Sequence, residues 1–221
     1  MLVSTHGIIA QSVSDASFAN TLSTSFDGID EQVDFTQVDL TSAFTTSFWI
    51  KPINLGASFL VGRNTNSDYI WLRTASQIRI RVNFSTYTFV EIGGNTINTG
   101  SWNHLLVIRD SLNNLRIFLN GASFSTLQIA SGNHRLNQIG GVSSNFYDGN
   151  VNNVAFWNSD QSANRSVIYN SGSPNDISSL SPLLWYRFGN GDTYPIITDN
   201  AGTNDGTMQN MSSANFVADV P

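Results

Sequence analysis

The sequence predicts an all-β domain in which short antiparallel strands pack as a sandwich or a barrel. Segments that alternate apolar and polar residues recur along the 221 residues, most clearly at 44–51 and 77–82. This period of two is typical of strands with one buried face. Turn signals separate the segments about every 8 to 12 residues. The 14 Phe, 6 Tyr and 5 Trp supply a large core, although only 12% of the residues are charged.

The segment 44–51 is the clearest strand of the N-terminal half. Its alternation puts Phe44, Phe48 and Ile50 on one face, which we expect to lie in the core. Pro52 ends the strand, because its nitrogen has no hydrogen to donate to a neighbouring strand. The other strands expected in this half are 22–26, 33–35, 59–61, 68–73, 77–82 and 87–91.

The C-terminal half contains further strands and one short helix. Asn120 and Gly121 predict a tight hairpin turn, because both residues tolerate the positive φ that such a turn requires. The helix is expected at 162–169, with Ser162 as its N-cap and Gly172 just beyond its end. The strands expected here are 102–110, 115–119, 123–125, 137–141, 151–157, 183–188 and 216–217.

The first 20 residues differ from the rest of the chain, because no hydrophobic period holds there. We interpret 1–20 as an N-terminal arm, either a loose tail or a segment that orders against a partner or a neighbouring copy. Residues 21–221 show no internal repeat and no strong linker, so we expect them to form one domain.

Charge and composition exclude several functions. The net charge is −6 and Lys51 is the only lysine, which argues against nucleic acid and against anionic membranes. The arginines at 73, 79, 81 and 116 are spread over three of the expected strands and form no run. The chain has no cysteine, and we find neither a signal peptide nor an apolar stretch of membrane-spanning length.

Five motifs follow one another in fixed order within residues 22–188, at 25–30, 44–52, 100–104, 117–121 and 147–158. Together they resemble one family, the laminin-G-like (concanavalin A-like) jelly-roll domains. The resemblance implies an antiparallel jelly-roll β-sandwich of two curved sheets packed face to face, with the short helix near 162–169.

The C-terminal part is similar to stand-alone jelly rolls among tailed-phage virion proteins, on the segments 168–172, 184–189 and 216–221. This similarity implies a virion structural protein: a capsid decoration, a head fibre or a tail adhesin. It would be made in the host cytoplasm without a signal peptide and would form a homo-oligomer on the particle. Residues 1–20 would bind other virion proteins or sister copies. The alternative is a secreted bacterial carbohydrate-binding or adhesion module.

We expect no enzymatic activity. Glycoside hydrolysis needs paired carboxylates, but Glu31 and Glu91 are the only glutamates and no Glu-x-Asp-x-Glu pattern occurs. A serine hydrolase needs a Ser, a His and an acid in one constellation. His6, His104 and His134 are the only histidines, no Gly-x-Ser-x-Gly elbow is present, and no histidine pair has the spacing of a zinc site.

Two binding sites are hypothesised. Related domains often hold a structural calcium, and the matching residues here are Asp27, Asp148 and Asn152, although both Asp-Gly pairs also fit plain turns. Host-surface glycans are the second ligand, since aromatic faces stack on sugar rings and polar groups bond to the hydroxyls. One set of candidates shares a strand face and the other shares a loop: Tyr69, Trp71 and Arg73, and Asn145, Tyr147 and Asp148. Alternatively, Trp71 packs in the core of the second sheet or at a subunit interface.

Overall fold

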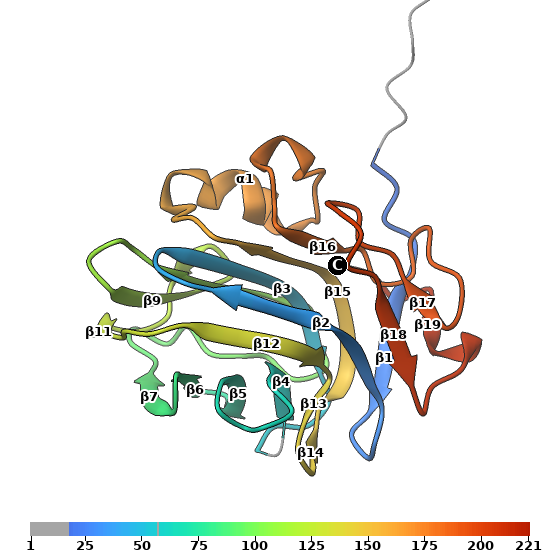
Figure 1. Ribbon diagram of the computed structural model, residues 1–221, viewed down its shortest axis with the longest axis horizontal. Coiled ribbons are helices and arrows are strands. Elements are labelled where there is room, and N and C mark those ends of the chain that lie inside the picture. The colour runs from blue at the N-terminus through green and yellow to red at the C-terminus, as the bar shows by residue number, and fades with distance from the viewer. Residues whose placement is uncertain (1–17, 57) are drawn as a thin grey trace, which may run out of the picture.

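The computed structural model describes residues 18–56 and 58–221 and contains two large antiparallel sheets packed face to face. Both sheets curve, and α1 (Arg165–Tyr169) lies on the outer side of one of them (Figure 1). The predicted all-β sandwich of two curved sheets with one short helix is therefore confirmed. None of the helices formed by the described residues is long and apolar enough to cross a membrane.

Sheet A contains the predicted strand 44–51 as part of β3. Its main path runs through β10 (Ala122–Ser123), β9 (Asn114–Leu119), β8 (Asn103–Arg109), β3 (Phe44–Pro52), β15 (Asp148–Trp157), β1 (Ser23–Asp27) and β19 (Phe216–Val217). Two further strands pair outside this path, β11 (Gln128–Ile129) with β9 and β16 (Leu184–Tyr186) with β15.

Sheet B forms the opposite layer. The order across sheet B is β17 (Ile196–Ile197), β18 (Gly206–Gln209), β2 (Gln32–Leu40), β12 (His134–Ile139), β4 (Ser58–Gly62), β5 (Tyr69–Thr74), β6 (Gln77–Val82) and β7 (Ser85–Val90). A small separate hairpin, β13 (Gly141–Val142) with β14 (Asn145–Phe146), follows β12 in the chain.

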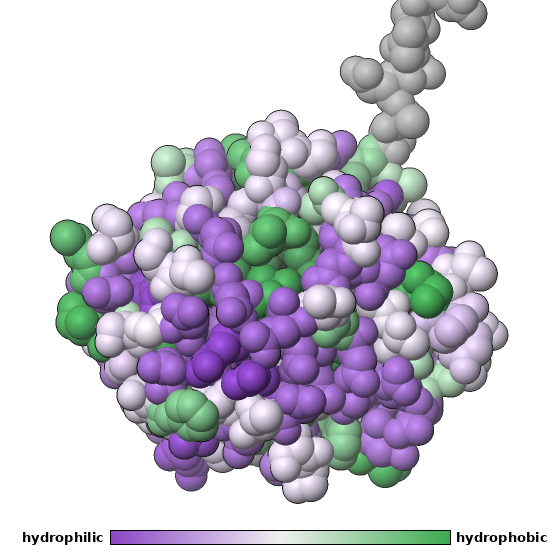
Figure 2. Space-filling model, in the orientation of Figure 1, coloured by the Kyte–Doolittle hydropathy of each residue, from purple (hydrophilic) through white to green (hydrophobic). Residues whose placement is uncertain are grey.

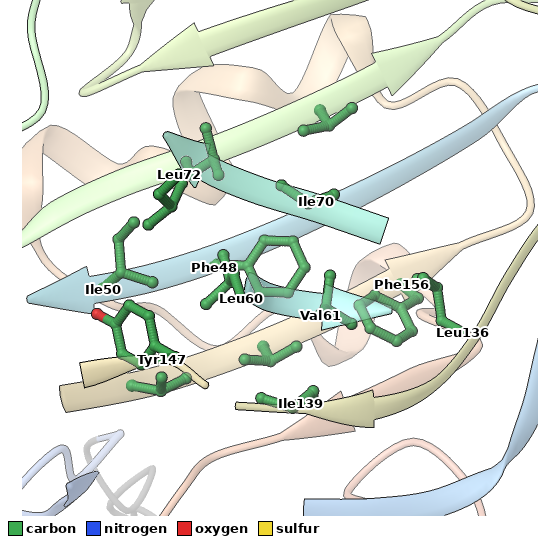
Figure 3. Packing of buried hydrophobic residues seen from close by; sticks show 14 of the residues in the cluster. Phe48, Ile50, Leu60, Val61, Ile70, Leu72, Leu136, Ile139, Tyr147 and Phe156 are labelled. Atoms are coloured by element: carbon green, nitrogen blue, oxygen red, sulfur yellow. The ribbon is translucent and has the colours of Figure 1, made fainter. Parts of the chain in front are cut away.

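The core lies between the two sheets. Phe48 and Ile50 of β3 face Leu60 of β4 and Leu72 of β5 (Figure 3), and all four are fully buried. The other face of β3 is buried as well, because α1 and neighbouring turns cover sheet A from outside. This second layer contains Leu106, Ile108, Phe118, Ala155, Trp157, Ile168, Ile177 and Trp185.

The helix begins differently from the sequence expectation. Ser162–Asn164 form a 3-10 turn, and α1 starts only at Arg165, so Ser162 is not its N-cap. The backbone N–H of Ser162 instead donates to Asp160 Oδ1 over 2.8 Å. The local sequence offered several polar capping residues, and the aspartate two positions earlier accepts this bond.

Three residues that we assigned to the arm contact the sandwich. The ring of Phe18 stacks on Trp185 with centroids 6.0 Å apart, and the Arg187 guanidinium lies 4.3 Å from the Phe18 ring. Arg187 also donates to the carbonyl of Ala19, and Asn190 donates to the side chain of Asn20. Residues 18–20 therefore pack with the domain, and the rest of the expected arm, 1–17, lies outside the described residues.

Candidate functional site

The outer side of β5 and β6 carries three arginines that strand pairing brings together. Ile70, Leu72, Ile78 and Ile80 point into the core, so the alternating residues point outward. Trp71 faces Arg79 across the ladder, and Tyr69 faces Arg81. With Arg73 on the same strand as Trp71, these residues form what we call the arginine face. The arginines are scattered in the sequence but adjacent on the sheet.

A break in the ladder affects Arg73. The β5–β6 register shifts between Leu72 and Thr74, so Arg73 has no partner residue on β6. Such a bulge bends its strand and re-aims the side chain of the unpaired residue. Arg73 and Arg79 both lie over the indole of Trp71, each with its guanidinium carbon 5.3 Å from the ring centroid.

Trp71 is held by contacts on several sides. Phe59 of β4 stacks on it with centroids 4.8 Å apart and 16° between the ring planes. Its Nε1 donates to the carbonyl of Gly56 over 2.6 Å. Because Phe59 and the two guanidiniums lie against the indole ring, a sugar ring has no free aromatic face on which to stack. Trp71 belongs to a small outer cluster, not to the core between the sheets. Tyr69 in the same cluster is only 6% exposed.

The arginines of this face have few acceptors within the protein. Among the described residues, the side chains of Arg73 and Arg79 neither donate a hydrogen bond nor form an ion pair, and Arg79 Nε is buried without a partner. Arg81 donates to two backbone carbonyls, those of Phe84 and Asn66. Because a guanidinium offers five N–H donors in a planar fork, most of this capacity is unused.

The nearest acid in sequence is already engaged. Asp68 is the only acidic residue within 58–90, a stretch that contains four arginines. Its buried carboxylate lies 3.3 Å from Arg135 Nε and 3.7 Å from His134 Nδ1. Burial alone would raise the pKa of Asp68, but His134, the Asn83 backbone and Ser67 together lower it to about 2. Asp68 thus stays ionised beneath the sheet surface and pairs with none of Arg73, Arg79 and Arg81.

The second set of predicted glycan contacts does not share a surface. Tyr147 is fully buried and points into the core (Figure 3), where its hydroxyl donates to the carbonyl of Asn150. Burial raises the pKa of Tyr147 well above its ordinary value. Asn145 and Asp148 are partly exposed, but Tyr147 cannot present its ring to a ligand in this fold. Tyr147 directly precedes β15, and the alternation of side chains along this segment directs its ring into the core.

The predicted calcium ligands are only partly brought together. Asp27 and Asp148 face each other across the β1–β15 ladder. Asn152 lies four residues further along β15, is fully buried, and donates to the carbonyl of Leu22 over 2.7 Å. Within residues 18–56 and 58–221, no group of three His, Cys, Asp or Glu side chains is placed to hold a metal ion. The three residues therefore do not form one site.

One histidine has a serine partner. His104 Nε2 and Ser47 Oγ lie 2.9 Å apart, and both side chains are buried beneath Trp49 and Tyr169. Burial lowers the pKa of His104 to about 3, so the ring is neutral at pH 7. No carboxylate of the described residues contacts this ring, and the geometry accounts for the pair as part of the packed outer layer of sheet A.

A depression that the sequence reasoning missed lies beside β2. Its volume is about 330 Å³, and amide and carboxylate side chains surround Val38 and Leu183. Figure 2 shows one face of the molecule, on which hydrophilic residues surround a central apolar patch. The depression joins residues that are far apart in the sequence: Gln37, Val38, Asp39, Leu183, Asp199, Gly202, Thr203 and Asn204.

Comparisons with known proteins agree with this architecture. A family model described as "Concanavalin A-like lectin/glucanases superfamily" matches residues 27–165. No curated protein matches the sequence. A solved structure of a candidate carbohydrate-binding protein from Bacteroides ovatus is 15% identical with a TM-score of 0.68, and the match covers 87% of this chain and 59% of that one. The heptameric SAP-like pentraxin of Limulus polyphemus is 14% identical with a TM-score of 0.54, with 85% and 95% covered. At these identities the likeness concerns the fold.

Proposed function

The chain belongs to the concanavalin A-like lectin/glucanase superfamily, and we propose that it is a non-enzymatic carbohydrate-binding protein. The laminin-G-like resemblance of the five sequence motifs is thereby confirmed. One observation carries the proposal: the guanidiniums of Arg73 and Arg79 lie over Trp71, yet neither side chain donates to a described residue. Apart from the buried Nε of Arg79, their N–H groups can donate to the oxygens of a glycan.

The fold likeness to the Bacteroides ovatus protein supports this proposal, since that protein is named for carbohydrate binding. The chain spans only 59% of that protein's length, so the likeness extends to one part of it.

The two glutamates lie too far apart to act together as a hydrolytic pair. Glu31 precedes β2 and accepts a bond from Asn215, whereas Glu91 follows β7 and accepts one from Gly94. In sheet B, β12, β4, β5 and β6 lie between β2 and β7. At about 4.8 Å per strand the two are roughly 24 Å apart, far beyond the about 5 to 9.5 Å of a hydrolytic carboxylate pair.

A glycan array probed with the isolated protein tests the binding role. We expect binding to a restricted set of glycans, and Trp71→Ala should abolish it because both guanidiniums lose their support. Arg116→Gln, which changes a residue of sheet A, should bind as the unchanged protein does. A thermal melt of each variant separates loss of binding from loss of folding. An array without any bound glycan, or Trp71→Ala binding normally, would contradict the proposal.

We further propose that the protein is part of a phage virion, as a capsid decoration, head fibre or tail adhesin made in the host cytoplasm. Its similarity to virion jelly rolls lies in 168–172, 184–189 and 216–221. The secreted bacterial module is the second candidate, and the fold likeness to the Bacteroides ovatus protein favours it. A mass-spectrometric inventory of purified virions distinguishes them, because only the first candidate predicts this chain in the particle.

The same proposal assigns residues 1–17 to attachment to other virion proteins or to sister copies. The truncation that tests it should keep residues 18–20, because Phe18 and Ala19 contact Trp185 and Arg187. A chain that begins at Phe18 should fold as the full chain does and should be missing from assembled particles. Normal incorporation of the truncated chain would refute the attachment role.

A further inference from the structure

We propose that the arginine face selects acidic polysaccharides, that is, glycan chains that carry carboxylate or sulfate groups. Arg73 and Arg79 form a paired anion site over Trp71, and Arg81 extends it. This inference rests on the proposed carbohydrate-binding function and names the class of ligand.

The geometry places two cations against one ring. Phe59 stacks on the Trp71 indole, and the guanidiniums of Arg73 and Arg79 both lie over the same ring. Each guanidinium carbon is 5.3 Å from the ring centroid, so the two charges are at most about twice that distance apart. The bulge at Arg73 supports this arrangement, because it frees that side chain from a ladder position.

The charges of this pair are not compensated by any ion pair within residues 18–56 and 58–221. None of the ion pairs formed by the described residues includes Arg73, Arg79 or Arg81. Two like charges close together raise the energy of the free protein, and a bound anion would lower it. A guanidinium matches a carboxylate or a sulfate through two parallel N–H···O bonds, so an acidic group fits the pair better than a neutral hydroxyl does.

The residues around the Arg73–Arg79 pair suit a polysaccharide chain better than a small ion. Arg79 and Arg81 lie two residues apart on the same side of β6, about 6.6 Å from each other along the strand. Thr88 and Thr86 of β7 face them across the ladder and add hydroxyl groups to the same surface. Since β7 is the last strand of sheet B, the row of polar groups is open at the sheet edge. A linear polymer with repeated acidic groups can follow such a row.

Nucleic acid is a poorer match for the same surface. Its single strands bind through bases stacked on aromatic rings, and Phe59, Arg73 and Arg79 already cover the indole.

The test measures binding of the full chain to heparin, polygalacturonate, neutral glucans and mannan, and a single-stranded oligodeoxythymidine. We expect the two acidic polysaccharides to bind, and the double variant Arg73→Gln with Arg79→Gln to weaken this binding at least about tenfold. Arg116→Gln is the control, because it makes the same Arg-to-Gln change, with the loss of one positive charge, at a residue already paired with Asp110. Raising the salt from about 50 to about 200 mM should weaken binding of the unchanged protein more than that of the double variant.

The outcomes separate this inference from the proposed function. Equal binding to neutral polysaccharides, unaffected by the double variant, would overturn the acidic selectivity and leave carbohydrate binding in place. Absence of binding to every polysaccharide, here and on the array, would overturn both. Binding to the oligodeoxythymidine as tight as that to heparin would show a general attraction for polyanions and would also overturn the inference. Thermal melts of the variants establish that each is folded.

Discussion

Arg109 offers the sharpest test of how the sandwich is held together. Its side chain is fully buried at the end of β8, and its guanidinium lies 4.6 Å from the ring of Phe44. No acid pairs with it among the described residues. It donates instead to four backbone carbonyls in the β2–β3 and β11–β12 connections: Thr41, Ser42, Ala130 and Gly132. One side chain thereby joins loops that lead into both sheets.

The perturbation is Arg109→Met, which keeps much of the length and removes every donor. Hydrogen bonds from charged groups contribute about 1.5 to 3 kcal/mol each, but burial of the charge offsets a large part of that sum. Burial also lowers the pKa of the Arg109 guanidinium, because the charged form loses its contact with water inside the protein. Because all four carbonyls lose this donor and the buried contact with Phe44 is changed, we expect a net loss of about 3 to 5 kcal/mol in the free energy of unfolding.

Urea unfolding followed by tryptophan fluorescence measures this loss, and a thermal melt should fall by roughly 6 to 20 °C for a domain of this size. The control is Arg116→Met, which removes a partly exposed ion pair with Asp110 and should change stability by about 1 kcal/mol or less. A loss of less than about 1 kcal/mol for Arg109→Met would refute the reasoning, because the loops would then hold without the guanidinium.

Two further predictions concern a turn and a buried acid. Gly121 and Gly93 share a φ of +79°, but an added Cβ at Gly121 would lie 2.7 Å from Tyr169 Cδ1, while Gly93 has open space. Gly121→Ala should therefore lower stability by about 1 to 3 kcal/mol more than Gly93→Ala in urea unfolding, and equal losses would contradict the contact. The pKa of Asp68 falls from 3.8 to about 2 on folding, so its stabilisation of about 2 kcal/mol is present above pH 4 and lost as the pH falls towards 2. Asp68→Asn should flatten this acid-side decline, and an unchanged decline would show that other groups cause it.

The fold could be predicted because alternation reports burial directly. Phe48 and Ile50 are buried where the period of two places them. The same pattern could not show that Trp49, on the opposite face, is also buried, at 3% exposure. That burial comes from Tyr169 and the rest of the helical segment, which return to sheet A from more than a hundred residues away. A local period describes one strand and carries no information about what covers its other side.

Part of the arginine face could have been predicted from the sequence. The alternating segments 68–73 and 77–82 are separated by only a few residues, which predicts a hairpin, and residues equally far from its turn must then face each other. That rule alone places Arg79 opposite Trp71 and Arg81 opposite Tyr69, as observed. It does not predict Arg73, because the bulge that turns this residue onto the indole depends on packing that no spacing encodes. The position of Arg79 on Trp71 therefore follows from the hairpin, whereas the position of Arg73 follows from an irregularity in that hairpin. For this reason the double variant, and not either single one, is the decisive test of what the face binds.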